Sequence, residues 1–195
     1  ITIDFFGNAS CGTINESIVF QTSTINASGT CFTIGAGNIV IDGNNSLIIG
    51  NGAGYSFYLS EKNNVTITGF NLSNFSTGIY LTGSSNNTFN DFYIHDSISY
   101  GVYFYATSTE NNFTNGYIFN SSSYDLYLDD AISMYGHRDQ DNYLTNFSID
   151  KSSIYAGTDA TLTMKWYADV QVNDTNSNSL SNVNITAYKA DGTIE

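Results

Sequence analysis

The stretch Gly78-Ile79-Tyr80-Leu81 decides the fold, because near-copies of it recur at steps of about 22 to 24 residues. The copies are Ser56-Phe57-Tyr58-Leu59, Gly101-Val102-Tyr103-Phe104 and Asp125-Leu126-Tyr127-Leu128. In each copy a tyrosine stands between two apolar residues, the alternation typical of a strand with one buried face. A repeat of this length that contains strands predicts a solenoid.

Working outward from this stretch, each repeat contains two further alternating segments and a pair of polar turn residues. The apolar-x-apolar segments lie at 47–49, 70–72, 92–94, 117–119 and 147–149, and the turn pairs at 63–64, 86–87, 111–112 and 141–142. We therefore expect three short strands per coil, such as those holding Val65 with Ile67, Phe70 with Leu72, and Ile79 with Leu81. One coil cannot bury its apolar face alone, so stacked coils of about 22 to 25 residues predict an all-β parallel β-helix over residues 1–150.

After Asp150 the repeat stops, and residues 151–195 show a different texture. The segments 161–167, 170–172 and 182–186 read as strands separated by polar turns, and we expect these strands to be antiparallel. We expect the first strands of an immunoglobulin-like β-sandwich, which is either continued beyond Glu195 or completed by a strand from another subunit.

The repeats, of the form Asn-Asn-x-Thr-Ile followed by Gly-Ile-Tyr-Leu, resemble those of the pectate-lyase-like superfamily of right-handed parallel β-helices. More specifically, they resemble the NosD-like repeats common in archaeal surface proteins. The segments 11–14, 31–34 and 38–43 resemble the usual first coil of those proteins. The resemblance covers roughly residues 10 to 150 and is more specific for fold than for activity.

Composition excludes several partner classes. The net charge is −13, and the basic residues are only Lys62, Arg138, Lys151, Lys165 and Lys189. Phosphate contacts need lysine and arginine, so nucleic acid and anionic membrane surfaces are poor partners. No segment reaches the ~18 apolar residues that span a bilayer.

Asparagine sequons are unusually dense. Asn-x-Ser/Thr occurs at Asn8, Asn15, Asn26, Asn44, Asn64, Asn71, Asn74, Asn86, Asn112, Asn120, Asn146, Asn173 and Asn184. This density favours an extracellular, N-glycosylated protein at the cell surface. In that compartment Cys11 and Cys31 would pair, stabilising the fold by roughly 3 kcal/mol, whereas a reducing compartment would leave two buried thiols.

The best candidate for chemistry is the long excursion from Asp125 to Asp141. Read functionally, its carboxylates hold structural Ca²⁺ or act as an acid and base pair on a glycosidic bond; otherwise it is a solvated polar loop. The candidate calcium ligands are Asp129, Asp130, Asp139 and Asp141. Lyases of the pectate-lyase-like superfamily, which these repeats resemble, typically use basic residues as the catalytic base. Here Lys62 and Arg138 lie about three coils apart, too far to share one site. His95 and His137 have no histidine partner at metal-binding spacing, and two methionines, two cysteines and two histidines form no soft copper site.

The column Tyr58, Tyr80, Tyr103 and Tyr127 is the most informative surface feature. Stacked coils would place these rings about 4.8 Å apart on the outer face. Either the column only stabilises successive coils, or it stacks on sugars or docks a neighbouring subunit. The asparagine pairs are expected to form structural ladders in the turns.

From these observations the leading hypothesis is a structural, glycosylated subunit of an extracellular filament, surface layer or adhesin, polymerising by strand addition. It predicts no enzymatic activity and no required cofactor. The alternatives are a carbohydrate-binding module that uses the tyrosine column and, third, a polysaccharide lyase or hydrolase.

Overall fold

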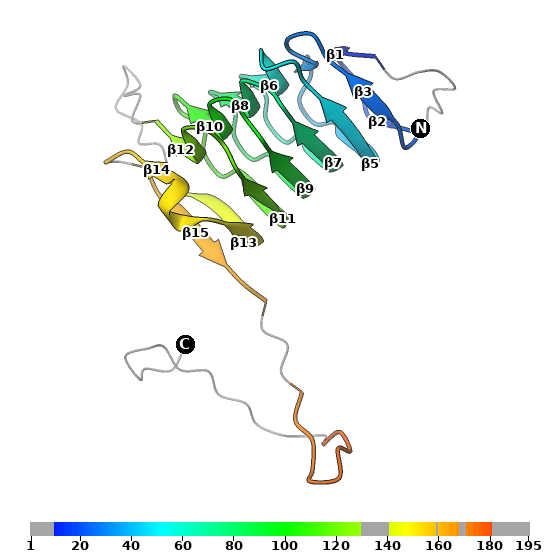
Figure 1. Ribbon diagram of the computed structural model, residues 1–195, viewed down its shortest axis with the longest axis vertical. Helices are drawn as coiled ribbons and strands as arrows, with labels where there is room; N and C mark the ends of the chain where they lie inside the picture. Colours follow the sequence, from blue (N-terminus) through cyan, green and yellow to red (C-terminus); the bar gives the residue numbers. More distant parts are fainter. Residues whose placement is uncertain (1–9, 130–140, 159, 168–170, 181–195) are drawn as a thin grey trace.

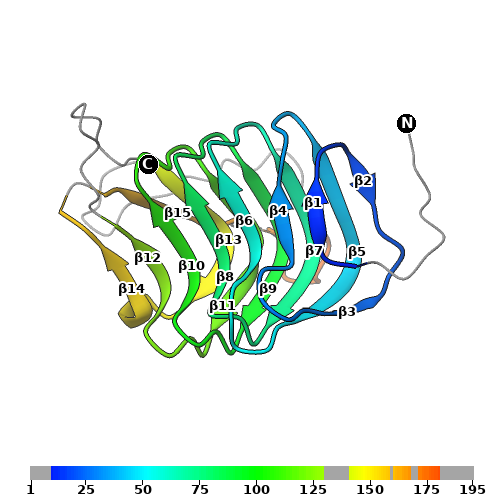
Figure 2. The same ribbon diagram turned by 90° about the horizontal axis from the view of Figure 1, so that it is seen from above.

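The computed structural model describes residues 10–129, 141–158, 160–167 and 171–180, and most of these coil into a solenoid of parallel strands (Figure 1). The strands form two sheets that enclose one apolar core. This is the predicted all-β, right-handed parallel β-helix, in which right-handed crossover between parallel strands is the strongly favoured hand. Figure 2 shows the strands of successive coils side by side along the solenoid axis.

We call the first sheet the tyrosine sheet, after the residues on its outer face. Its strands, in spatial order, are β1 (Gly12–Ile14), β4 (Phe32–Ile34), β6 (Tyr55–Ser60), β8 (Thr77–Thr82), β10 (Tyr100–Tyr105), β12 (Tyr124–Leu128) and β14 (Ile154–Ala156). Every neighbouring pair in it is parallel.

We call the second sheet the asparagine sheet. Its strands are β2 (Ile18–Val19), β3 (Thr24–Asn26), β5 (Val40–Ile49), β7 (Thr66–Ser73), β9 (Thr88–His95), β11 (Asn112–Phe119), β13 (Asn142–Ile149) and β15 (Leu162–Lys165). β2 and β3 both pair with β5, at opposite ends of that strand. The rest follow in chain order.

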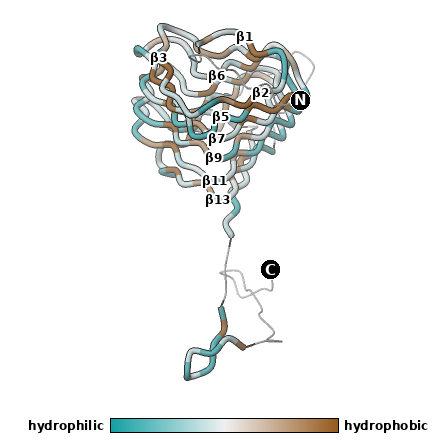
Figure 3. The backbone as a smooth tube through the Cα atoms, turned by 90° about the vertical axis from the view of Figure 1, so that its right-hand side faces the viewer, coloured by the Kyte–Doolittle hydropathy of each residue, from teal (hydrophilic) through white to brown (hydrophobic). Residues whose placement is uncertain are grey.

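Alternation along each strand builds the core. Parallel register places inward residues of successive coils above one another, for example Phe57, Ile79, Val102 and Leu126, all fully buried. Apolar and polar segments accordingly alternate along the coils (Figure 3). Like side chains therefore stack on like, which is how units too short to fold alone share one core.

The coil has two strands where the sequence predicted three. The strands expected around Val65–Ile67 and Phe70–Leu72 merge into the single strand β7, which bends at Gly69 (φ 72°). Asp91, Asn115 and Asn146 bend β9, β11 and β13 in the same way. A left-handed residue turns the chain without ending the hydrogen-bonded ladder, and glycine, asparagine and aspartate tolerate this conformation best.

The glycine at the first position of the repeated four-residue stretch, such as Gly101, is explained by close packing between the two sheets. A β-carbon on Gly101 would lie 2.3 Å from Cγ2 of Ile118, in the opposite sheet, and 2.5 Å from the backbone oxygen of Asp125. No side chain fits at that distance. Glycine at this position therefore lets the sheets approach each other beneath the tyrosines.

The turn that leads into the asparagine sheet contains a buried asparagine ladder. The Nδ2 of Asn87 donates to Oδ1 of Asn111 (3.0 Å), and the Nδ2 of Asn111 donates to Oδ1 of Asn142 (3.1 Å). The backbone N–H groups of the preceding coil also donate to this ladder. Oδ1 of Asn87, Asn111 and Asn142 accepts from Val65, Asn87 and Asn111, respectively. The ladder thus pairs backbone groups that the turn would otherwise bury unsatisfied.

Beyond Asp150, residues 151–158 and 160–165 continue the solenoid. Asp150 caps the 3₁₀ turn Lys151–Ser153, and β14 and β15 then pair in parallel with β12 and β13. This corrects the antiparallel strand expected at 161–167, because its alternation suits either sheet type and only pairing decides. Beyond it, Asn173 and Ser179 form an isolated antiparallel bridge, and 168–170 and 181–195 lie outside the described residues. The sandwich stays a prediction.

At the start of the solenoid, Cys11 and Cys31 form a disulfide with a Cα–Cα separation of 4.4 Å. They immediately precede β1 and β4, which are neighbours in the tyrosine sheet. The bond therefore ties the first coil to the second.

Candidate carbohydrate-binding surface

Nine tyrosines gather on the outer face of the tyrosine sheet, and we call them the tyrosine strip. They are Tyr55, Tyr58, Tyr80, Tyr100, Tyr103, Tyr105, Tyr124, Tyr127 and Tyr155. The predicted column is its axis, since parallel register aligns Tyr58, Tyr80, Tyr103, Tyr127 and Tyr155. The other four members flank this axis. Neither they nor Tyr155 were predicted, although each flanking tyrosine stands two or three residues from a column tyrosine and Tyr155 follows an apolar residue.

The rings of the strip contact one another along the solenoid. Ring centroids are 5.6 Å apart between Tyr58 and Tyr80, with planes 8° from parallel, and 4.5 Å apart between Tyr127 and Tyr155, with planes 11° from parallel. Tyr103 breaks the pattern because its ring stands at 88° to that of Tyr127. Five coils at about 4.8 Å per step make the axis of the strip roughly 19 Å long. The result is an elongated amphipathic surface of ring carbon and phenol hydroxyls.

Tyr103 turns because its hydroxyl donates a hydrogen bond to Oδ2 of Asp129, at 2.6 Å. Burial, and then this bond and the negative charge of Asp129, raise the pKa of Tyr103 far above its usual value. The Tyr80 pKa is raised to about 12, mainly by burial and then by the neighbouring phenols. At neutral pH the phenols of Tyr80 and Tyr103 are therefore protonated, and the carboxyl group of Asp129 lies beside Tyr103.

None of the described sequon asparagines lies on a strand of the tyrosine sheet. Asn26, Asn44, Asn71, Asn112 and Asn146 lie on strands of the asparagine sheet, and the others in turns or, for Asn173, in the C-terminal segment. Asn8 and Asn184 are outside the described residues. Glycans at these positions would leave the strands of the tyrosine strip bare.

The structure also supplies a second reason for the abundant asparagines. Left-handed backbone angles occur at Asn44, Asn64, Asn74, Asn86, Asn120 and Asn146. In four sequons the Nδ2 already donates within the fold: Asn64 to Asn38, Asn74 to Gly50, Asn120 to Asp96 and Asn146 to Asn115. Turn geometry thus accounts for part of the sequon density, and glycosylation itself stays a prediction.

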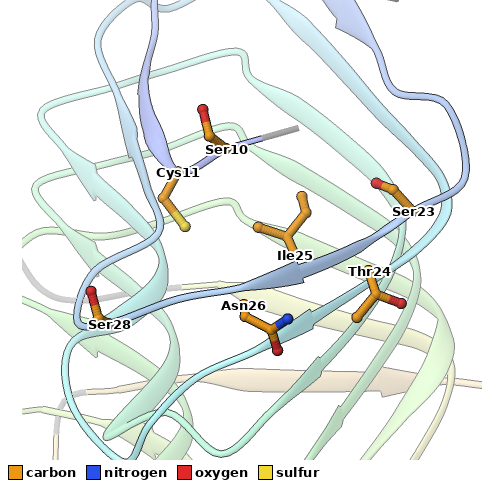
Figure 4. A pocket seen from close by; sticks show the side chains of 7 residues that line it. All are labelled: Ser10, Cys11, Ser23, Thr24, Ile25, Asn26 and Ser28. Atoms are coloured by element: carbon orange, nitrogen blue, oxygen red, sulfur yellow. The ribbon is translucent and has the colours of Figure 1, made fainter. Parts of the chain in front are cut away.

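A shallow pocket of about 300 Å³ opens at the N-terminal coil, lined by Ser10, Cys11, Ser23, Thr24, Ile25, Asn26 and Ser28 (Figure 4). Its polar groups are hydroxyls and one amide. It offers no carboxylate, imidazole or ammonium group, so we assign it no acid–base chemistry.

The predicted calcium site is only partly described. Asp129 engages Tyr103, Asp141 lies in the turn before β13, and Asp130 and Asp139 fall outside the described residues, as do His137 and Arg138. Within the described ranges no three histidine, cysteine, aspartate or glutamate side chains gather where they could hold a metal ion. The calcium site stays a prediction.

Comparison with known families identifies the solenoid. The model of the family described as periplasmic copper-binding protein (NosD) matches residues 6–146. The family's name places it outside the cytoplasm, in keeping with the predicted compartment. Among curated protein sequences none matches the chain. The described residues contain no helix long and apolar enough to cross a membrane.

Three solved structures share the fold. The catalytic domain of a GH87 α-1,3-glucanase in complex with tetrasaccharides matches with a TM-score of 0.59, 20% identity and 80% coverage of this chain. A second structure of such a domain, with nigerose, gives a TM-score of 0.58 at 20% identity and 80% coverage. An alginate lyase from Paenibacillus sp. gives 0.60, 21% and 76%. This chain spans 34%, 33% and 57% of those chains respectively.

These likenesses correct one prediction. We expected no enzymatic activity, and the structures with this fold are a glycoside hydrolase and a polysaccharide lyase. The expectation rested mainly on the absence of a recognisable catalytic constellation and failed because the solenoid is a framework for more than one kind of site. At this identity the likeness itself establishes the shared fold.

The copper in the family's description does not suit the described donor set. Cys11 and Cys31 are joined in the disulfide, and the imidazole of His95 is held between Asp96 (2.7 Å) and Asn71 (3.0 Å). Met164 packs against the core. Soft copper ligands must converge on one point, and these do not.

Proposed function

The chain belongs to the NosD family of parallel β-helix proteins, and we propose that it binds a polysaccharide outside the cytoplasm along the tyrosine strip. The observation that carries the proposal is the strip itself. Nine tyrosines on one face, repeating at the coil spacing, suit a ligand that is itself a repeating chain with apolar faces and hydroxyl edges. Support also comes from the placement of the sequon asparagines away from that sheet.

Charge selects the class of polysaccharide. Asp129 hydrogen-bonds to Tyr103 of the strip, and the whole chain has a net charge of −13. A polyuronate would be repelled, whereas a neutral glycan would meet phenols and a carboxylate that hydrogen-bond its hydroxyls. We therefore favour a neutral polysaccharide.

The test measures the affinity of the purified protein for neutral and acidic polysaccharides by affinity electrophoresis. We expect Tyr80→Ala to weaken binding of a neutral polysaccharide about tenfold, since about 1.4 kcal/mol of contact energy corresponds to that factor. Tyr93→Ala, an equally large change on the outer face of the asparagine sheet, is the control and should bind as the wild type does. The proposal is contradicted if both variants lose the same affinity, or if the wild-type protein binds no polysaccharide.

A second candidate is cleavage of the bound polysaccharide, favoured by the Tyr103–Asp129 pair. Hydrolysis and elimination both need one group that gives a proton and one that takes it. The Tyr103 hydroxyl donates to Oδ2 of Asp129 at 2.6 Å, so a hydroxyl and a carboxyl group lie side by side on the strip. If the pair is catalytic, Asp129→Asn abolishes the release of new chain ends from a bound polysaccharide while binding persists. Release that survives in the variant removes this pair from consideration.

The assembly role predicted from sequence is a separate proposal. In the described residues the tyrosine sheet ends at β1 and β14, and the asparagine sheet at β15 and, toward the N-terminus, at β2 and β3. Strands at the ends of sheets are where further copies add. Ordered filaments or lattices in electron micrographs of the secreted protein would support a surface scaffold, and persistent monomers would refute it.

A further inference from the structure

A second aromatic patch lies on the opposite sheet, where the polysaccharide proposal makes no use of it. It consists of Tyr93, His95, Tyr117 and Phe119 on β9 and β11. Tyr93, Tyr117 and Phe119 are among the most exposed aromatic rings of the solenoid, at 38%, 37% and 44%. The rings touch: Tyr93 and Tyr117 have centroids 4.5 Å apart, and His95 stacks on Phe119 at 5.3 Å. Exposed aromatic clusters on an otherwise polar sheet call for something to cover them.

A sequon asparagine stands in the same column as these tyrosines. Parallel register pairs Asn71 with Tyr93, and Tyr93 with Tyr117, on the outer face of three successive coils. Neighbouring members of such a column are about 4.8 Å apart. A group attached to Asn71 is therefore delivered directly beside the Tyr93 ring.

The amide of Asn71 is oriented for attachment. Its Oδ1 faces Nε2 of His95 at 3.0 Å, and because an amide oxygen can only accept, the imidazole is the donor. The other ring nitrogen of His95 is held by Asp96 at 2.7 Å, which fixes the imidazole plane. The Nδ2 of Asn71 has no hydrogen-bond partner among the described residues. N-glycosylation occurs at that nitrogen and leaves the oxygen free for His95.

The neighbouring sequons differ in this respect. The Nδ2 of Asn74 donates to the backbone oxygen of Gly50 at 3.0 Å, and that of Asn120 donates to Asp96. Of the three sequons around the patch, Asn71 alone combines an unengaged Nδ2 with a place in the tyrosine column.

We propose that Asn71 is N-glycosylated and that its first sugar rings lie on the Tyr93–Tyr117 surface, so that the chain's own glycan covers this patch. The apolar face of a pyranose suits a phenol ring. Holding the glycan also restricts it, so the patch and the glycan stabilise the folded state together. This proposal is independent of polysaccharide binding on the opposite sheet, and either can fail alone.

The test secretes the full chain from a glycosylating eukaryotic host and measures site occupancy by peptide mass spectrometry, with the melting temperature as second readout. Ser73→Ala removes the sequon but keeps the Asn71–His95 hydrogen bond intact. We expect Asn71 to be occupied, and Ser73→Ala and Tyr93→Ala each to lower the melting temperature by about 2 to 4 °C. The double variant should melt no lower than either single variant, because each change removes the same contact.

The controls separate the glycan from the ring. In protein made without glycosylation, Tyr93→Ala and Ser73→Ala should leave the melting temperature within about 1 °C of the wild type, as surface substitutions do. An unoccupied Asn71 overturns the proposal. So does an effect of Tyr93→Ala that is equal with and without glycan, since the ring would then act only through the protein.

Discussion

The tyrosine sheet and the asparagine sheet follow the same inward alternation and differ in how like residues contact each other between coils. On the tyrosine sheet, successive coils touch through half-buried rings on the outside. On the asparagine sheet, apart from the aromatic patch on β9 and β11, they touch through amides. These include exposed pairs such as Asn115 with Asn146 (2.9 Å) and the buried ladder that precedes the strands. The comparison teaches that stacking of like residues is general to the solenoid, whereas its energetic weight depends on burial.

The largest effect expected from this difference is at the centre of the buried ladder. Asn111→Ala removes the acceptor of two N–H donors and leaves the backbone oxygen of Ser84 without its donor, while Oδ1 of Asn142 keeps only the backbone N–H of residue 111. Unsatisfied buried groups cost ~1 to 3 kcal/mol each, so we expect unfolding in urea to be easier by about 3 kcal/mol or more. Asn90→Ala, which removes half-buried amide contacts, is the control and should cost under about 1 kcal/mol. If both variants lose a similar free energy of unfolding, burial does not determine how much a ladder contributes to stability.

The next effect tests why the tyrosine sheet needs its glycine. Gly101→Ala forces a β-carbon against Ile118 and the backbone of Asp125, and overpacking of this kind costs about 1 to 3 kcal/mol. Gly12→Ala, in β1 of the same sheet, meets no atom within 4 Å and should be neutral to about 0.5 kcal/mol. Thermal denaturation of both variants checks the pair. If Gly101→Ala leaves the stability unchanged, the two sheets can move apart beneath the tyrosines.

The smallest effect concerns protons on the tyrosine strip. Because the folded-state pKa of Tyr80 is raised from 10.0 to about 12, its contribution to stability is present below pH 10 and is lost as the pH rises from 10 to about 12. Ultraviolet titration of phenolate should show a step near pH 12 that disappears in Tyr80→Phe, while Tyr103, whose pKa is also raised, still ionises late in that variant. Tyr93→Phe, on the other sheet, should retain it. If all phenols ionise together near 10, the strip is more open to water than the structure indicates.

Much of this site could be predicted from repeats. The tyrosine axis followed from Tyr80 and its copies, because a period of one coil places equivalent residues in one column. The flanking tyrosines and the Tyr103–Asp129 hydrogen bond could not be predicted. They depend on side chains that lean across columns and on where the chain emerges after β12.

The residues at the edges of the repeat show the same limit. Alternation around Leu162 and Met164 predicted strands but not partners, and the partners proved to be those of the solenoid. The expectation of no enzymatic activity failed similarly, since an inventory of residue types does not reveal which fold relatives carry catalysis.

By itself the sequence determined the periodic part of this protein: the alternating segments, the coil length, the buried columns and the outward tyrosine column, since a two-residue alternation nested in a coil-length repeat places equivalent residues above one another. Only the tertiary structure decided which polar residues are buried, which turns bend a strand without ending it, and which sequon amides are engaged. Those properties depend on contacts between coils some twenty residues apart in the chain, where neither local propensity nor composition acts.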